Sequence, residues 1–182
     1  MDIINYGKTG YFGLPDGGWF RRGLELAMII RFNKKSLYKF NTNNFAVLSG
    51  YTGLYFIFLD NLLIPYPYNS SPLIYIGMSE SSLNSIGNRL KDHLSGRSNN
   101  QGIKGYYQKW GLSFTYLDYE FLKHVFSTIR IEPIETYFLE DFAQEYGTYP
   151  ICNNKRGFAE NMPNLSQKPQ IEWRFFEESN DK

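Results

Sequence analysis

The chain has 182 residues, 42% of them hydrophobic and 18% aromatic, which excludes an intrinsically disordered protein. This length allows one domain with extensions but not two domains of ordinary size. The net charge of +1 excludes a polycation, so any affinity for nucleic acid has to come from local clusters of Lys and Arg. Such clusters occur at Arg21-Arg22, Lys34-Lys35, Arg89 to Arg97, Lys104 to Lys109 and Lys155-Arg156. Any one of them taken alone is more typical of a solvated surface.

The cellular compartment is indicated by the cysteine count and by hydropathy. Cys152 is the single cysteine, which excludes an internal disulfide framework and a multi-cysteine metal site and fits a reducing environment. No segment has the apolar run of a signal peptide or of a membrane span. We therefore expect a soluble cytoplasmic protein that does not bind membranes.

The first half of the chain predicts an extension followed by two strands. Residues 1–50 are interrupted by Gly and Pro, with a short apolar helix or strand at 24–32, and form an N-terminal extension that could contact DNA or mediate dimerisation. Residues 53–60 and 72–79 are runs of aromatic and β-branched residues typical of strands. Because they are adjacent along the chain, we expect an antiparallel pair.

A helix is predicted after the second strand. Its apolar residues recur every three or four positions, at Leu83, Ile86, Leu90 and Leu94, and Gly96 marks its end. Residues 111–121 then alternate apolar and polar side chains as a half-buried strand does.

The last part of the domain predicts a second helix. Pro133 can begin a helix, Gly147 can end it, and the apolar stripe between them consists of Ile134, Phe138, Phe142 and Tyr146. The resulting β-β-α-β-α order predicts a small α+β domain over 51–154. Residues 155–182 form a C-terminal extension, and its tail after Asn161 is expected to dock as an extended segment through Trp173, Phe175 and Phe176.

Three polar residues on the predicted helices are placed for chemistry. Arg89 and His93 are four residues apart, so they share one helix face beside the apolar stripe. Glu135 lies in the first turn of the second helix and on the face of Leu139, whereas Glu140 aligns with Thr136 on the solvent side. Glu135 is therefore the carboxylate expected to point inward.

These residues, with Tyr55 and Tyr75, fit hydrolysis of a phosphodiester. A divalent metal on the carboxylate polarises the phosphate, a guanidinium stabilises the developing charge, and a phenol or imidazole moves a proton. Because Glu135 is the one acidic ligand in this group, we expect one Mg²⁺ or Mn²⁺ per site, completed by waters.

Five short motifs carry a family resemblance. They are Gly53-Leu54-Tyr55, Tyr75-Ile76-Gly77, "RLKDH" from Arg89 to His93, "ETYFL" from Glu135 to Leu139, and "PICN" from Pro150 to Asn153. In this order they resemble the GIY-YIG nuclease family over residues 51–154. The resemblance implies a three-stranded antiparallel sheet flanked by helices, and cleavage of DNA with one divalent metal ion.

The resemblance also implies a role for each site residue. Tyr55 would be the general base or water-orienting group, and Tyr75 would lie beside the scissile phosphate. Arg89 would stabilise the phosphorane and Glu135 would bind the metal. The two remaining catalytic residues are His93, as a second polar group, and Asn153, which would brace the site.

The sequence departs from the family at two positions, and one assignment stays open. Leu54 replaces the isoleucine of the first motif, and Met78 follows the second motif where many members have lysine. The segment 120–132 is long, so Glu132 and Glu140 remain alternatives to Glu135.

Structural explanations compete with these roles. The chain has 15 tyrosines, so Tyr55 and Tyr75 could be ordinary core residues. Arg89 could extend past Ile86 to solvent, and Asn153 could belong to a turn after Pro150. An isolated histidine such as His93 is more often partly exposed than catalytic.

The expected function is a metal-dependent endonuclease acting on double-stranded DNA, of the sequence-specific, type II-like restriction class. Extensions at both ends would supply the base contacts that a small catalytic core lacks. Cutting both strands suggests a homodimer. A structure-specific repair nuclease is the alternative, although the chain has no Cys/His spacing for a zinc module. A non-catalytic nucleic-acid-binding module is the third.

Overall fold

The computed structural model describes residues 3–6, 11–13, 19–21, 27–32, 37–127, 130–153 and 168–178. At its centre is a four-stranded antiparallel sheet in the order β5-β10-β6-β9. Its strands are β5 (Tyr38–Lys39), β6 (Gly53–Leu59), β9 (Leu73–Ser79) and β10 (Leu112–Asp118). The expected α+β class and the three long strands are confirmed. The expected three-stranded sheet is wrong by one short edge strand, because a two-residue strand has no periodicity to detect.

Six helices are described, together with short strands outside the central sheet. The helices are α1 (Thr42–Val47), α2 (Ile86–Ser95), α3 (Gln101–Trp110), α4 (Tyr119–Phe126), α5 (Glu132–Tyr146) and α6 (Arg174–Glu178). The short strands are β1 (Ile3–Tyr6), β2 (Tyr11–Gly13), β3 (Trp19–Arg21), β4 (Ala27–Ile30), β7 (Ile64–Pro65), β8 (Ser70–Ser71) and β11 (Gln170–Ile171). None of the helices in this described part of the chain is both long and apolar enough to cross a membrane.

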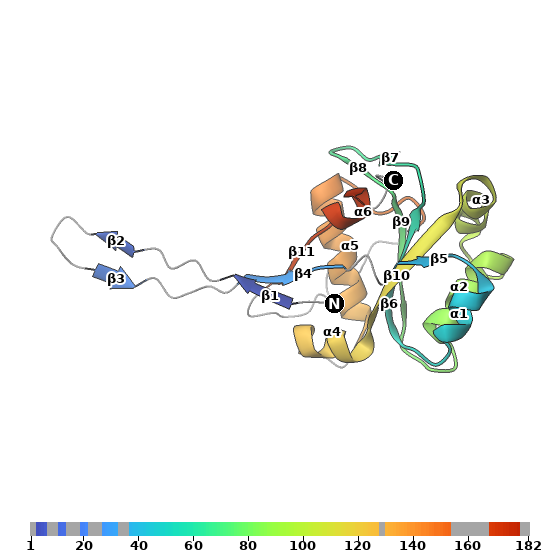
Figure 1. Ribbon diagram of the computed structural model, residues 1–182, viewed down its shortest axis with the longest axis horizontal. Helices are drawn as coiled ribbons and strands as arrows, with labels where there is room; N and C mark the ends of the chain where they lie inside the picture. Colours follow the sequence, from blue (N-terminus) through green and yellow to red (C-terminus); the bar gives the residue numbers. More distant parts are fainter. Residues whose placement is uncertain are drawn as a thin grey trace.

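Strand β6 divides the core into two layers. All seven of its residues are buried, and successive side chains point to opposite faces of the sheet. Leu54, Phe56 and Phe58 pack in a cluster with side chains of α4, α5 and α6. Tyr55 and Ile57 pack in a second cluster with α1, α2 and α3. Figure 1 shows the sheet between these two groups of helices.

The core includes residues from both expected extensions. Phe40 and Phe45 belong to the α1–α3 cluster, and β5 pairs with β10, so the packing crosses the predicted boundary at residue 50. At the other end, Trp173, Phe175 and Phe176 are buried against the α4–α6 cluster. Docking of the C-terminal segment through these aromatics is therefore confirmed, although the last two lie in helix α6 and not in an extended segment.

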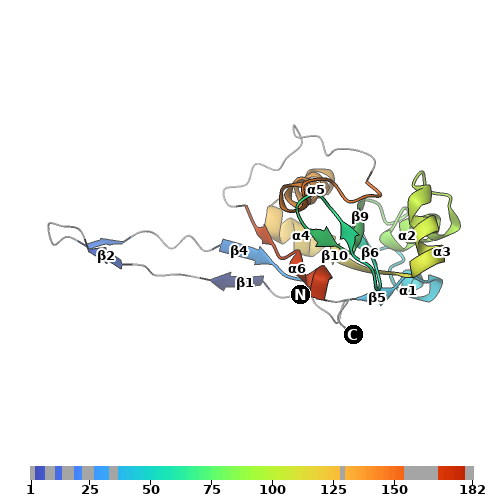
Figure 2. The same cartoon turned by 90° about the horizontal axis from the view of Figure 1, so that it is seen from above.

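The N-terminal strands form their own pairings. β1 and β4 are antiparallel, β11 adds to β4 in parallel, and β2 pairs with β3. Figure 2 shows β2 and β3 well away from the central sheet. The predicted apolar segment at 24–32 thus contains a strand. Arg22, Lys34-Lys35 and Lys155-Arg156 lie outside the described residues.

The ends of α2 and α5 show how the sequence fixes the helices that hold the site. The Ser85 hydroxyl accepts a hydrogen bond from the Asn88 amide, and Gly96 ends α2 with φ 77°. Leu83 precedes this cap and is 90% exposed, so its assignment to the buried stripe was wrong. Helix α5 matches the predicted span, but Thr136 is buried and not on the solvent side.

Candidate active site

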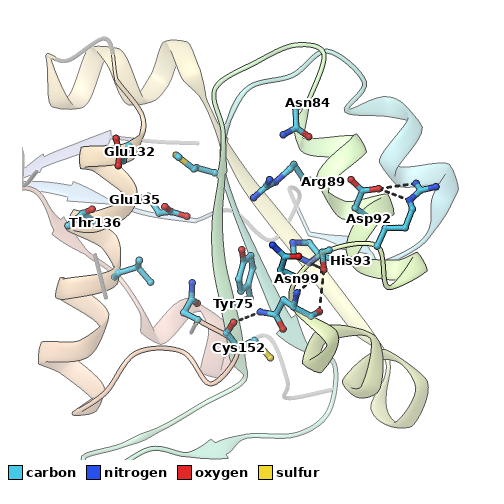
Figure 3. A pocket seen from close by; sticks show the side chains of 16 residues that line it. Tyr75, Asn84, Arg89, Asp92, His93, Asn99, Glu132, Glu135, Thr136 and Cys152 are labelled. Carbon is cyan, nitrogen blue, oxygen red and sulfur yellow. Dashed lines mark hydrogen bonds and ion pairs between the residues drawn. The ribbon is translucent and has the colours of Figure 1, made fainter. Parts of the chain in front are cut away.

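A cavity of about 630 Å³ lies at the β9 edge of the sheet. Its volume is within the usual range for ligand sites. Because β9 is the edge strand of the central sheet, α2 from one helix layer and α5 from the other approach each other across this edge (Figure 3). The predicted site residues that line the cavity are Tyr75, Arg89, His93, Glu135 and Asn153. Tyr55 is the one predicted site residue that does not line it.

Tyr55 and Tyr75 lie side by side because of the register between β6 and β9. Tyr55 pairs with Gly77, and Tyr75 pairs with Ile57, which places the two phenol rings on the same face with centroids 6.0 Å apart. A Cβ at Gly77 would lie 2.5 Å from both rings, so only glycine fits between them. Tyr75 reaches the cavity, whereas Tyr55 is 0% exposed.

The burial of Tyr55 argues against its predicted role as general base. Burial raises the pKa of its phenol well above the ordinary value of 10.0, and the neighbouring Tyr75 acts in the same direction, although Arg89 opposes both. The phenol therefore remains protonated and has no direct path to solvent. Its hydroxyl instead lies 3.0 Å from Nε2 of His93.

His93 joins this phenol to the loop after α2. Its Nδ1 is 2.9 Å from the Ser98 hydroxyl, so both ring nitrogens have hydrogen-bond partners. The side chain is buried, and this burial lowers the pKa of His93 to about 4, with the Arg89 cation acting in the same direction. The imidazole is therefore neutral near pH 7 and fixes the ring of Tyr55 beneath Tyr75.

Two arginines line the cavity, and Arg89 supplies its unneutralised positive charge because Arg97 is paired with Asp92. Arg89 lies one turn before His93 on α2, is half-buried and points toward the strand that carries Tyr75 (Figure 3). Among the described residues, no carboxylate lies within ion-pair distance of its guanidinium. A partly desolvated cation without a paired carboxylate is costly unless it meets an anion, so it favours binding of an anionic group here.

Glu135 faces Arg89 from the opposite wall. It lies in the first turn of α5, and burial raises its pKa to about 7 from an ordinary 4.5, although Arg89 lowers it. The carboxylates of Glu132 and Glu80 raise it further. At neutral pH this carboxyl is therefore divided between its protonated and ionised forms.

The structure narrows the choice of metal ligand among Glu132, Glu135 and Glu140, the three α5 glutamates that the sequence left open. Glu132 and Glu135 both line the cavity, whereas Glu140 lies outside it and accepts a hydrogen bond from the Tyr149 hydroxyl at 2.6 Å. Within the described residues, no group of three or more His, Cys, Asp or Glu side chains is placed to hold a metal. A divalent ion would therefore depend on Glu135 and oxygen atoms of water or substrate, which fits the hard-oxygen preference of Mg²⁺.

Asn153 holds the last motif, Pro150 to Asn153, against strand β9. Its Oδ1 accepts a hydrogen bond from the Ile76 amide at 3.0 Å, and its Nδ2 donates to the Ile76 carbonyl at 2.7 Å. The Cys152 amide donates to the Ile74 carbonyl two residues earlier. Asn153 thus satisfies both backbone groups of a residue in the Tyr75-Ile76-Gly77 motif, which is a bracing contact.

Sequence reasoning missed two supporting residues. Ser98 contacts His93, but a single serine after a helix gives no signal for this contact. Glu80 accepts hydrogen bonds from the Ile131 and Glu132 amides at 2.9 and 3.1 Å, and so caps the start of α5 from the end of β9. Its only signal is a carboxylate directly after a strand, because the helix lies about fifty residues further along the chain.

Four of the five motifs, far apart in the sequence, therefore line one cavity at the edge of the sheet, and the first motif lies on the neighbouring strand β6. The cavity has a cationic wall on α2, an acidic wall on α5 and the phenol ring of Tyr75 between them. Comparison of the chain with protein-family models, curated proteins and solved structures gives no significant match.

Proposed function

We propose that this protein is a metal-dependent DNA endonuclease that hydrolyses phosphodiester bonds. The observation that carries the proposal is the position of Arg89 and Glu135 on opposite walls of one cavity, with Tyr75 between them. An arginine without a paired carboxylate suits the phosphate, and a carboxylate on the far side suits a divalent cation. The order of the motifs supports the same chemistry.

Each residue has a distinct part in the proposed reaction. The Arg89 guanidinium binds the phosphate and stabilises the negative charge that grows on it in the transition state. Tyr75 is the tyrosine that lines the cavity. Its hydroxyl orients the attacking water or the phosphate by hydrogen bonding. The rings of Tyr55 and His93 pack against the Tyr75 ring, and Asn153 holds its strand.

Glu135 would hold a Mg²⁺ or Mn²⁺ ion, with Glu132 as a neighbouring carboxylate. Such an ion would polarise the phosphate and favour its attack by water. Glu135 must be ionised to bind a cation, and its raised pKa means that the proton and the metal compete for it near pH 7.

Within this proposal, a sequence-specific restriction enzyme is favoured over a repair nuclease. The described structure has the aromatic core of one small domain and additional strands β1 to β4, which are candidates for contacts beyond the catalytic core. Cutting both strands of a duplex with one proposed active site per chain suggests two chains acting together, so we propose a homodimer on DNA.

The proposal is tested by incubating purified protein with plasmid DNA in Mg²⁺, with an EDTA control and a Glu135→Ala variant. Glu145→Ala is the matched control, because Glu145 lies on the same helix but is exposed and away from the cavity. We expect discrete fragments from wild type and Glu145→Ala, and none from Glu135→Ala or with EDTA.

Other results would redirect or overturn the proposal. Cleavage of branched DNA alone would favour a repair nuclease, and DNA binding without any cleavage would favour the non-catalytic module. Equal cleavage by Glu135→Ala and wild type would show that the acidic wall of the cavity does not take part. Arg89→Gln provides an independent check, because loss of its charge should lower the cleavage rate by at least about 100-fold.

A further inference from the structure

Helix α3 continues from the rim of the cavity onto the outer surface. Asn99 and Asn100 line the cavity, and α3 begins at the next residue. The side-chain amide of Asn100 donates a hydrogen bond to the Cys152 backbone carbonyl, and a Cβ at Gly102 would lie 3.3 Å from Cys152 Sγ. Because Cys152 also lines the cavity, the start of α3 is packed directly against the cavity wall.

Most of α3 is not used by the core. Ile103 is its only buried residue, whereas Tyr107 and Trp110 are 36% and 44% exposed. The rings of Tyr106 and Trp110 have centroids 5.4 Å apart, and the Lys109 ammonium lies 5.4 Å from the centre of the Trp110 ring. The helix therefore presents aromatic rings together with a cation held over one of them.

The charge around α3 has one sign. Residues 93–117 contain no Asp or Glu but include Arg97, Lys104 and Lys109. Asp92, directly before this stretch, is paired with Arg97 at 2.9 Å, and Asp60, which lies beside Gly111, is paired with Lys39 at 3.0 Å. Asp118, directly after the stretch, accepts a hydrogen bond from the Phe121 amide and caps α4. Lys104 and Lys109 have no carboxylate within ion-pair distance among the described residues.

We propose that α3 binds the phosphate backbone of duplex DNA beside the phosphate that occupies the cavity. This inference rests on the proposed nuclease function and assigns the surface that carries the flanking duplex. Lys104 and Lys109 neutralise phosphates, and Trp110 holds the Lys109 ammonium outward and packs against sugar atoms. DNA is the polyanion that would extend from a phosphate bound at Arg89 past Asn99 and Asn100 to this helix.

Equilibrium binding separates this contact from catalysis. Each variant is made together with Glu135→Gln, so that bound DNA is not cut, and binding to a mixed-sequence duplex is measured in EDTA over a range of salt concentrations. Loss of one phosphate contact should lower the slope of log affinity against log salt by about 0.9, which corresponds to about eightfold weaker binding at about 0.1 M salt. We expect this change for Lys109→Gln, and about twice the slope change when Lys104→Gln is added.

Lys123→Gln is the matched control. Lys123 also lies over an aromatic ring, 6.0 Å from the centre of Tyr119, but on α4 in the opposite helix layer. The Lys123→Gln variant removes the same charge and the same type of contact as Lys109→Gln. An equal loss of DNA affinity in these two variants would therefore overturn the proposal. Trp110→Ala should weaken binding about fivefold with no change in net charge, and Trp110→Phe should restore most of it. Equal affinity of Trp110→Ala and the parent would also overturn it.

The two proposals fail in different ways. If wild type cuts DNA and the α3 variants bind as tightly as the control, the nuclease stands and the α3 surface is wrong. If the Glu135→Gln parent binds no DNA and wild type cuts none, both proposals are wrong. Circular dichroism melting of each variant shows that a loss of affinity comes from a folded protein.

Discussion

Gly77→Ala tests the geometry on which the site depends. The added Cβ would lie 2.5 Å from Tyr55 Cζ, 2.5 Å from Tyr75 Cε1 and 2.6 Å from the Tyr55 hydroxyl. Ordinary contacts between such atoms are about 3.5–4.0 Å, so the two rings must separate by about 1 Å or more. Tyr55 cannot move freely, because it is fully buried and hydrogen-bonded to His93.

The expected cost has two measurable parts. Overpacking of this kind lowers the free energy of unfolding by about 1–3 kcal/mol, which urea denaturation followed by circular dichroism measures. A shift of about 1 Å at Tyr75 should also reduce the cleavage rate by about 100-fold. The second effect should persist at temperatures where the variant is fully folded.

Gly105→Ala is the control for this prediction. Gly105 lies in the middle of α3, and no atom lies within 4 Å of a Cβ built there. Alanine at this position should therefore stabilise the protein by about 0.5–1 kcal/mol through helix propensity. If Gly77→Ala were as stable as wild type, the close approach of the Tyr55 and Tyr75 rings to Gly77 would be refuted.

Three further predictions concern titration and capping. Glu135 has a folded pKa of about 7 against an ordinary 4.5, so its contribution to stability is present below about pH 4.5 and is lost as pH rises to about 7; Glu135→Gln should abolish this decline in denaturation curves. His93 has a folded pKa of about 4 against an ordinary 6.5, so its effect on stability has the opposite pH dependence to that of Glu135. Its contribution to stability is present above about pH 6.5 and is lost as pH falls to about 4, and His93→Gln should remove this acid sensitivity. Glu80→Ala should cost about 1 kcal/mol and speed hydrogen exchange of the Ile131 and Glu132 amides, whereas Glu80→Gln, which keeps an acceptor oxygen, should retain most of the protection; identical exchange in all three proteins would contradict the cap.

Long periodic segments were predictable from sequence. The three long strands were recovered because β6 and β9 are runs of aromatic and β-branched residues and β10 alternates apolar and polar side chains. Helices α2 and α5 were recovered because their apolar side chains recur over at least two turns. Leu83 was misplaced because its spacing fits the stripe, although the helix begins only after the serine cap two residues later. Helices α1 and α4 were missed because they are short, and α3 was missed because it has just one buried residue and so no apolar stripe.

Placement of the site residues was predictable, but their depth was not. Spacing put Arg89, His93 and Glu135 on inward faces, and the structure brings them to one cavity with Tyr75 and Asn153. The burial of Tyr55 behind Tyr75 depends on the register of β6 against β9, which a single sequence does not specify. The contacts of Ser98 and Glu80 depend on tertiary packing in the same way.

The amide of Asn153 has a consequence beyond the site. β9 is an edge strand with a buried, apolar sequence, and such an edge is a template on which a second chain can add a strand. Cys152 and Asn153 occupy the backbone groups of Ile74 and Ile76, so the edge is covered where it would otherwise be open. The residue that braces the cavity therefore also protects the protein against aggregation through its own sheet.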